Sequence, residues 1–225
     1  MKTETRLRLA LAGKLLIVFL VCLGTYQMMT GLIPGTSFTD KGLRALRYFT
    51  VLSNLLMGLA ALLYGIALLR LLLHRTKRVP KWNQVLLLMG AASVGLTFLV
   101  VIGFLLPVLR VKDMFHGANL WFHLVVPLLS MGSYAFLDRF AQLKKRAIFL
   151  GALPMLLYGL FYTGNCLLNG VGEYGNYQSC NDWYHFLIWG YPVGVGIFLL
   201  LIGATVGLAA VLHRLNQGKN SPPSD

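Results

Sequence analysis

The chain has 225 residues, of which 57% are hydrophobic and only 12% are charged, and its mean hydropathy is +0.69. Soluble domains carry about 25% charged residues, so this composition excludes an ordinary soluble domain. The formal net charge of +13 would favour a nucleic acid partner in a soluble protein. Here the positions of the basic residues indicate membrane topology instead, and we expect no nucleic acid partner.

The apolar residues form six blocks of about 20 residues, the length that an α-helix needs to cross a membrane. In chain order the expected spans are 15–33, 49–73, 85–108, 118–137, 147–168 and 183–212. The first block follows basic residues, as in a secretory signal, but it continues without a small-residue cleavage pattern. The sequence therefore predicts an all-α, polytopic membrane protein, a bundle of six transmembrane helices.

The basic residues gather in alternate connections. Of the 20 Lys and Arg residues, 15 lie on one side of the predicted membrane: Lys2, Arg6, Arg8, Lys14, Arg70, Arg75, Lys77, Arg78, Lys81, Arg139, Lys144, Lys145, Arg146, Arg214 and Lys219. The other side has Lys41, Arg44, Arg47, Arg110 and Lys112. Basic residues stay on the cytoplasmic side during insertion, so we expect both termini in the cytoplasm of a multi-pass protein of the cell membrane.

This topology divides the chain into three parts. A basic cytoplasmic segment, 1–14, precedes a transmembrane domain, 15–212, and a polar tail, 213–225, follows it. The tail contains two adjacent prolines and little apolar surface, so we expect it to be cytoplasmic and disordered.

Polar residues concentrate in the outer half of the predicted bundle. They are Tyr26, Gln27, Thr50, Ser53, Asn54, His116, Asn119, His123, Tyr162, Thr163, Asn165, Asn169, Asn181, Asp182, Tyr184 and His185. The inner half holds little beyond the basic residues that fix topology. Because intramembrane polar residues face the bundle interior or a cavity, we expect an outer cavity lined by the second, fourth, fifth and sixth helices.

Thr50 and His123 are the candidate catalytic pair. Thr50 shares a helix face with Ser53 and Asn54, and His123 shares one with Asn119. Both lie about one turn inside their spans, at similar depth if the helices are neighbours. A hydroxyl and an imidazole are the minimal pair for nucleophilic acyl transfer. The alternative is that Thr50 bonds to a carbonyl of its own helix and His123 is a packing residue.

Other polar residues are candidates for binding a substrate or an oxyanion, namely Ser53, Asn54, Asn119, Tyr162, Asn165, Asp182 and His185. Asp182 either orients His123 or, as we favour, is an interfacial polar group like His185. The histidines lack the spacing of a metal site, so we expect no metal and no cofactor. Cys166 and Cys180 either form a disulfide across the fifth connection or remain thiols.

Two segments carry a resemblance to known proteins. Residues 47–56, which include Thr50, resemble the second-helix motif of small bacterial six-helix membrane proteins of unassigned function. Residues 119–129 resemble their fourth-helix motif, in which Pro127 follows His123 by four residues. These proteins are distantly similar to the eukaryotic androgen-induced membrane proteins, which hydrolyse fatty acid esters of hydroxy fatty acids with an intramembrane threonine and histidine. The resemblance implies that Thr50 is the nucleophile and His123 the histidine.

Two functions follow as hypotheses. The first is an intramembrane acyl-transfer enzyme, a lipid ester hydrolase, with membrane lipids as partners and a lipid ester as substrate. The alternative is a non-enzymatic membrane protein that binds or transports a lipid or a small solute through the same outer cavity. A transporter is expected to show polar or broken helices over the full membrane depth.

Overall fold

The computed structural model describes residues 3–31, 42–108, 114–174, 176 and 179–217. Several residues used above to assign topology lie outside these ranges, namely Lys2, Lys41, Arg110, Lys112, Lys219 and the tail from 218 onward. The described residues are helical or irregular and contain no strand. The prediction of an all-helical protein is confirmed for them.

The first half of the chain forms three long helices. They are α1 (Thr3–Thr30), α2 (Phe49–Leu72), which follows the short 3₁₀ helix η1 (Gly42–Arg47), and α3 (Lys81–Val100), which continues through the π-helical turn η2 (Val101–Leu105) into α4 (Leu106–Val108). α1 thus begins within the segment that the sequence analysis assigned to a cytoplasmic arm.

The second half contains two interrupted helices and one long one. α6 (Ala118–Leu120), the π-helical turn η3 (Trp121–Val125) and α7 (Val126–Phe136) follow one another without a break. Next come α8 (Ala147–Gly151), α9 (Leu153–Asn169) and α10 (Tyr191–Asn216). The expected start of the last helix at residue 183 is wrong, because residues 183–190 form turns and Pro192 stands in the first turn of α10.

Four of the described helices are long and apolar enough to cross a membrane. They are Glu4–Thr30, Phe49–Leu72, Lys81–Leu105 and Tyr191–Asn216. Their lengths match the helical span that about 30 Å of hydrocarbon requires.

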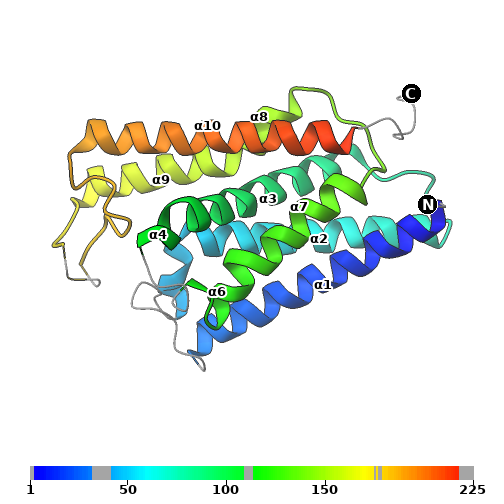
Figure 1. Cartoon of the computed structure of the whole chain (residues 1–225), viewed down its shortest axis with the longest axis horizontal. Coiled ribbons are helices and arrows are strands. Elements are labelled where there is room, and N and C mark those ends of the chain that lie inside the picture. The colour runs from blue at the N-terminus through cyan, green and yellow to red at the C-terminus, as the bar shows by residue number, and fades with distance from the viewer. Residues whose placement is uncertain (1–2, 32–41, 109–113, 175, 177–178, 218–225) are drawn as a thin grey trace.

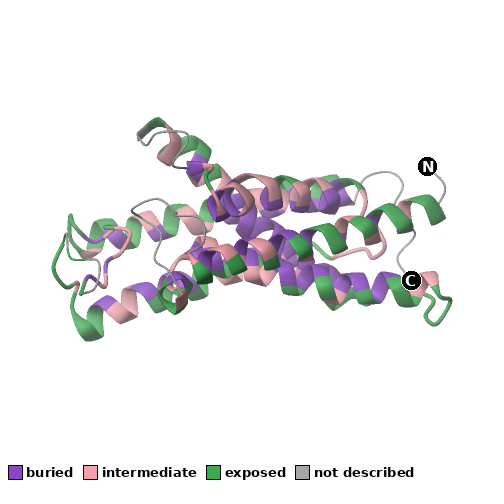
Figure 2. Cartoon of the chain, turned by 90° about the horizontal axis from the view of Figure 1, so that it is seen from below, coloured by how far each residue is buried: buried purple, intermediate pink, exposed green. Residues whose placement is uncertain are grey.

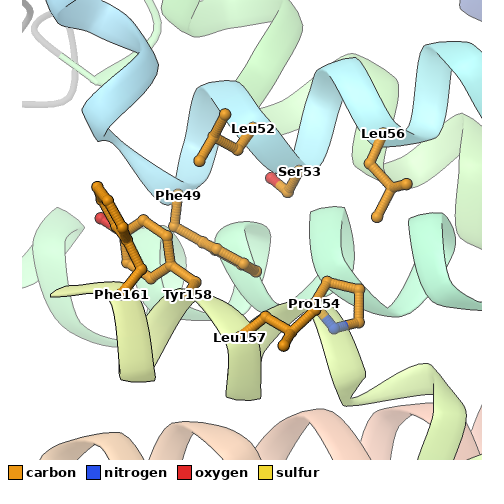
Figure 3. A pocket seen from close by; sticks show the side chains of 8 residues that line it. All are labelled: Phe49, Leu52, Ser53, Leu56, Pro154, Leu157, Tyr158 and Phe161. Atoms are coloured by element: carbon orange, nitrogen blue, oxygen red, sulfur yellow. The ribbon is translucent and has the colours of Figure 1, made fainter. Parts of the chain in front are cut away.

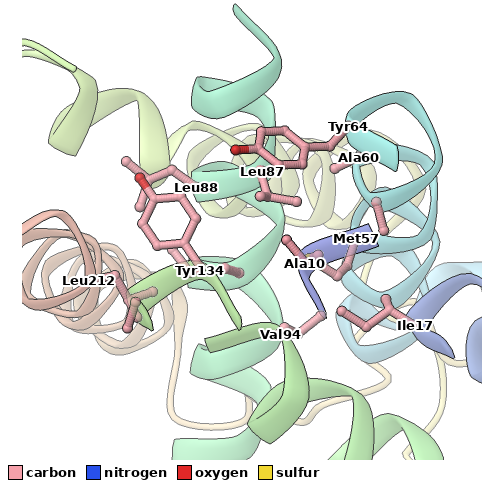
Figure 4. Packing of buried hydrophobic residues seen from close by; sticks show 14 of the residues in the cluster. Ala10, Ile17, Met57, Ala60, Tyr64, Leu87, Leu88, Val94, Tyr134 and Leu212 are labelled. Atoms are coloured by element: carbon pink, nitrogen blue, oxygen red, sulfur yellow. The ribbon is translucent and has the colours of Figure 1, made fainter. Parts of the chain in front are cut away.

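The helices lie nearly side by side in an elongated bundle (Figure 1). α3 runs between α1, α2 and α7 on one side and α9 and α10 on the other, while the buried residues concentrate near the middle of the molecule (Figure 2). Figure 4 shows how the large buried side chains interdigitate there, with Leu87 and Leu88 of α3 between Tyr64 of α2 and Tyr134 of α7. α3 is therefore the central helix of the packing.

Close approach of α2 and α3 depends on Gly90. A Cβ atom at this position would lie 2.9 Å from the Met57 sulfur and 3.0 Å from the Met57 Cα atom. We expect Gly90→Ala to lower the free energy of unfolding by about 1–3 kcal/mol, because overpacking forces backbone shifts. Thermal unfolding in detergent measures this change.

The matched control for Gly90→Ala is Gly132→Ala in α7. A Cβ atom at Gly132 meets nothing within 4 Å, and alanine favours helix over glycine by about 1 kcal/mol. Gly132→Ala should therefore leave the midpoint temperature of thermal unfolding unchanged or raise it. Equal losses at both positions would contradict the close approach at Gly90.

Candidate functional site

Asn54 joins the two helices that carry the candidate catalytic residues. Its side-chain amide donates to the carbonyl of Thr50 at 2.7 Å and to the carbonyl of Phe122, on η3, at 3.2 Å. The side chain is fully buried, and its Oδ1 atom has no hydrogen-bond partner among the described residues. Because both amide hydrogens are already in use, Asn54 is a structural link in this state and offers no free donor to an oxyanion.

Pro127 explains why the Phe122 carbonyl needs that link. In η3 the Val126 amide donates to the carbonyl of Trp121, five residues back. The Phe122 carbonyl thereby loses its usual α-helical donor, and the next residue, Pro127, has no N–H. Pro127 also lacks the N–H that would bond to the carbonyl of His123, four residues back. The structure adds a π-helical turn, a feature frequent at functional sites, and a partner for the freed carbonyl of the preceding residue.

The His123 ring is buried and oriented by the backbone. Its Nδ1 atom lies 3.0 Å from the carbonyl oxygen of Met114. A carbonyl only accepts, so Nδ1 carries the hydrogen and Nε2 is the nitrogen that can take up a proton. η3 is fixed further by Trp121, whose indole donates to Gln27 of α1 at 3.0 Å. The imidazole is thus held in the tautomer that a general base requires.

Thr50 stands in the first turn of α2 and is half-buried. Its carbonyl accepts hydrogen bonds from Ser53 and Asn54. The structure describes no hydrogen bond between Thr50 and His123. The two residues are connected only indirectly, through Asn54 and the carbonyl that precedes His123.

An apolar groove of about 290 Å³ lies between α2 and α9. Figure 3 shows its lining, namely Phe49, Leu52, Ser53, Leu56, Pro154, Leu157, Tyr158 and Phe161. The α2 residues of this set share one helix face, and Asn54 points roughly 150° away around the helix axis. The groove is therefore on the opposite side of α2 from η3 and His123. Of the four helices expected to line the outer cavity, the second and fifth form this groove.

Asp182 organises the turns that precede α10. One carboxylate oxygen accepts the Tyr162 hydroxyl at 2.5 Å and the Phe186 amide at 3.0 Å, and the other accepts the Tyr174 hydroxyl at 2.8 Å and the Leu187 amide at 2.9 Å. Burial and the neighbouring carboxylate raise the pKa of Tyr174 to about 12. Asp182 has no exposed surface, so it is a satisfied structural residue and does not orient His123.

Aromatic side chains connect the turns before α10 to the start of α2 through hydrogen bonds. Tyr184 accepts a hydrogen bond from the Phe49 amide at 2.9 Å, and Tyr158 donates to the Arg47 carbonyl at 2.7 Å. The indole of Trp183 donates to the Tyr158 hydroxyl at 3.0 Å. Phe49 and Tyr158 also line the groove, so the turns before α10 position one end of it.

The remaining predicted site residues are dispersed. Asn119 is buried, Asn165 accepts a hydrogen bond from Asn169, and His185 is exposed with its ring against Tyr174. The part of the chain that the structure describes contains no group of three His, Cys, Asp or Glu residues able to hold a metal ion. Cys166 and Cys180 are buried free thiols.

A buried ion pair was missed by the sequence analysis. Lys14 of α1 donates to Asp138 at 2.5 Å and to Ser133 at 2.9 Å, and its side chain is 1% exposed. The charge pattern of the sequence identified Lys14 as a topology signal and did not predict this pairing. Asp138 follows α7, and its burial raises its pKa while Lys14 opposes that shift. The one sequence feature that could have pointed to this pair is an aspartate directly after an apolar block.

Neutral side chains surround this ion pair. The carbonyl of Asp138 accepts from Gln84 of α3 at 2.6 Å and from Asn216 of α10 at 3.0 Å, and the Tyr64 hydroxyl donates to Gln84 at 2.7 Å. Five helices therefore meet at one buried polar cluster, and the expectation that the inner half is nearly free of polar residues is wrong.

Comparisons of the chain with protein-family models, with curated proteins and with solved structures found no match.

Proposed function

We propose that the chain is a multi-pass membrane protein with six spans and both termini in the cytoplasm. Besides the four long apolar helices, the chain is helical from Ala118 to Phe136 and, apart from Ala152, from Ala147 to Asn169. Both stretches are long enough to cross hydrocarbon. The distribution of basic residues supports the orientation.

Cysteine labelling from the two sides of the membrane tests this topology. In a variant whose three native cysteines are replaced by serine, single cysteines at Arg75 and Gln142 should react only from the cytoplasmic side. Cysteines at Lys41 and Asn176 should react with an impermeant reagent outside, because an odd number of spans separates the two sets. Reversal at any one of these positions contradicts the six-span arrangement.

We also propose that the protein is an acyl-transfer enzyme, a hydrolase of lipid esters. The observation that carries the proposal is the Met114 carbonyl bonded to His123, which leaves Nε2 as the proton acceptor. The Asn54 link between α2 and η3 supports it as well, because Thr50 is one helical turn from Asn54.

The proposed reaction needs only these two side chains and water. His123 Nε2 takes the hydroxyl proton of Thr50 while Oγ1 attacks the ester carbonyl carbon, and the imidazolium then protonates the departing alkoxide. Water, deprotonated by the same imidazole, then attacks the acyl carbonyl carbon. The bond from that carbon to Oγ1 breaks, the imidazolium returns its proton to Oγ1, and the carboxylic acid leaves. Thr50 and His123 must come within about 2.6–3.2 Å when substrate is bound.

Covalent labelling with a lipophilic fluorophosphonate tests the pair. We expect labelling of the wild-type protein and none of Thr50→Ala or His123→Ala, and either loss should cost nearly as much as both together. Thr50→Ser keeps the hydroxyl and should retain some reaction. Thr205→Val, which removes a buried hydroxyl that donates to the Leu201 carbonyl within α10, is the control and should label normally. Unchanged labelling of Thr50→Ala contradicts the proposal.

A second candidate function is lipid binding without chemistry. The observation that favours it is the groove between α2 and α9, whose lining is almost entirely apolar and faces away from His123. The volume is at the lower end for ligand sites and fits part of one acyl chain. Leu157→Trp should fill the groove and reduce photo-crosslinking of a fatty acid probe, while Thr50→Ala should leave crosslinking intact.

A further inference from the structure

The apolar groove between α2 and α9 runs along both helices. Figure 3 shows Phe49 and Phe161 at one end of it and Leu56 and Pro154 at the other. On each helix about seven residues separate these ends, which is a rise of about 10 Å. Since Phe49 is the first residue of α2, the groove begins at the end of a helix that is long enough to cross a membrane and follows that helix inward.

The rim of the groove is apolar and exposed. Leu52 is 37% exposed, Leu157 is 57% exposed and Phe161 is 59% exposed. In the proposed six-span arrangement these side chains face hydrocarbon, and the first turns of α2 lie in the outer half of the membrane. Lipid chains run in the same direction as the helices there, so an acyl chain fits the groove lengthwise.

A cation lies at the outer end of the groove. Arg47 is the last residue of η1, two residues before Phe49, and is half-buried. Its carbonyl accepts the Tyr158 hydroxyl at 2.7 Å, and Tyr158 lines the groove. The Arg47 backbone therefore contacts the groove wall directly. Arg44, three residues earlier on η1, is exposed and adds a second positive charge at this end.

Aromatic side chains hold the Arg47 guanidinium beside the groove. Its Cζ atom is 5.6 Å from the centroid of the Trp183 ring and 5.3 Å from that of Tyr48. The Trp183 indole donates to the Tyr158 hydroxyl at 3.0 Å, so one aromatic ring separates the guanidinium from a groove-lining side chain. Trp183 also packs edge-to-face on Tyr162 at 4.6 Å. The guanidinium is thus positioned before any ligand binds, which lowers the entropy cost of binding.

The order of the charge and the apolar wall matches one class of ligand. A guanidinium has five N–H donors, so a phosphate can share it with the Tyr48 hydroxyl, which accepts from Nη2 at 3.4 Å. Cation–π contacts use the face of the guanidinium, whereas phosphate binds along its edge. At the membrane surface the phosphate of a glycerophospholipid stands at this height, and its acyl chains continue into hydrocarbon.

We propose that the groove binds a glycerophospholipid, with its phosphate on Arg47 and one acyl chain between α2 and α9. This inference rests on the lipid-binding function proposed above and names the class of lipid. It does not involve acyl transfer, because the groove lies on the opposite side of α2 from His123.

Photo-crosslinking with two matched lipids tests the site. Both carry a diazirine in one acyl chain close to the glycerol; one is a phosphatidylglycerol, and the other is a diacylglycerol with the same chains and no phosphate. The experiment uses the full chain in maltoside micelles, which contain no competing phosphate. We expect the wild-type chain to crosslink the phospholipid about five- to tenfold more than the diacylglycerol, because hydrogen bonds between charged groups are the stronger ones. Mass spectrometry should locate the adducts on α2 and α9.

Three variants separate the phosphate contact from the groove. Arg47→Gln should reduce phospholipid crosslinking to the level of the diacylglycerol and leave the diacylglycerol yield unchanged, because it removes the charge and keeps the groove. Arg70→Gln is the matched control, since Arg70 is an exposed arginine in the last turn of α2, at the opposite end of that helix. It should keep the wild-type preference. Leu157→Trp should reduce crosslinking of both lipids, because it fills the groove.

Equal crosslinking of the two lipids to the wild-type chain overturns the proposal, and this comparison does not depend on whether Arg47→Gln folds. A retained preference in Arg47→Gln, or an equal loss in Arg70→Gln, also overturns it, since Arg47 then does not recognise the phosphate. If Leu157→Trp still reduces both yields in those cases, lipid binding in the groove stands without phosphate recognition. Unchanged yields in Leu157→Trp, or adducts outside α2 and α9, contradict lipid binding in the groove itself.

Discussion

Replacing Lys14 by methionine lowers the free energy of unfolding by about 3–5 kcal/mol, because it leaves the buried Asp138 carboxylate without its counter-ion. The Lys14 ammonium is 2.5 Å from Asp138, and both side chains are essentially inaccessible. Methionine preserves most of the volume of the lysine stem. The loss of stability therefore results from the unpaired carboxylate and not from a cavity. Denaturation of the detergent-solubilised protein measures it.

Arg8→Met on the same helix is the matched control. Arg8 pairs with Glu4 at 2.6 Å, but both side chains are more than two-thirds exposed. Exposed pairs contribute about 0–1 kcal/mol, so this variant should unfold like wild type. The double variant Lys14→Met with Asp138→Asn should regain much of the loss. If Lys14→Met lowers the free energy of unfolding as little as Arg8→Met does, the buried pair is not formed.

Asp182→Ala should be comparably damaging, at the opposite end of the molecule. It removes the acceptor of four hydrogen bonds, two from tyrosine hydroxyls and two from backbone amides. Each buried donor left unsatisfied costs about 1–3 kcal/mol. We expect a large fall in the unfolding midpoint together with faster proteolysis between α9 and α10, because the turns at 183–190 lose their anchor.

Two variants distinguish the loss of the Asp182 hydrogen bonds from the general effect of replacing a polar residue in this region. Asp182→Asn keeps one acceptor oxygen and should show an intermediate loss. Asn165→Ala removes only the exposed hydrogen bond with Asn169 and should have little effect. Normal stability of Asp182→Ala would show that the turns are held by the aromatic contacts alone.

Hydropathy by itself predicted the helical class and most helix positions. The ends of the second, third and fourth expected spans agree with the structure within a few residues, because all-round apolar blocks of this length have few alternatives to a helix. The last span was placed too early. Residues 183–190 are apolar enough to continue a helix. However, the buried Asp182 carboxylate accepts hydrogen bonds from the amides of Phe186 and Leu187, and these bonds stabilise a turn.

The candidate site was predictable only in part. Spacing identified Asn54 and His123 as inward-facing polar residues on their helices, and both are buried. Spacing did not predict that the Asn54 amide satisfies a carbonyl freed by a π-helical turn, since that contact joins residues 68 positions apart. The groove between α2 and α9 depends equally on how two distant helices pack.

Lys14 shows most clearly what the sequence alone could not predict. In sequence it is one more basic residue at the inner flank of an apolar block, and the charge rule for topology accounts for it. Its partner Asp138 is 124 residues away, and no local pattern connects them. Composition and periodicity determine which segments are helical and apolar. Only tertiary packing decides which polar groups meet inside, because burial makes an unpaired charge costly and so selects the arrangement that pairs it.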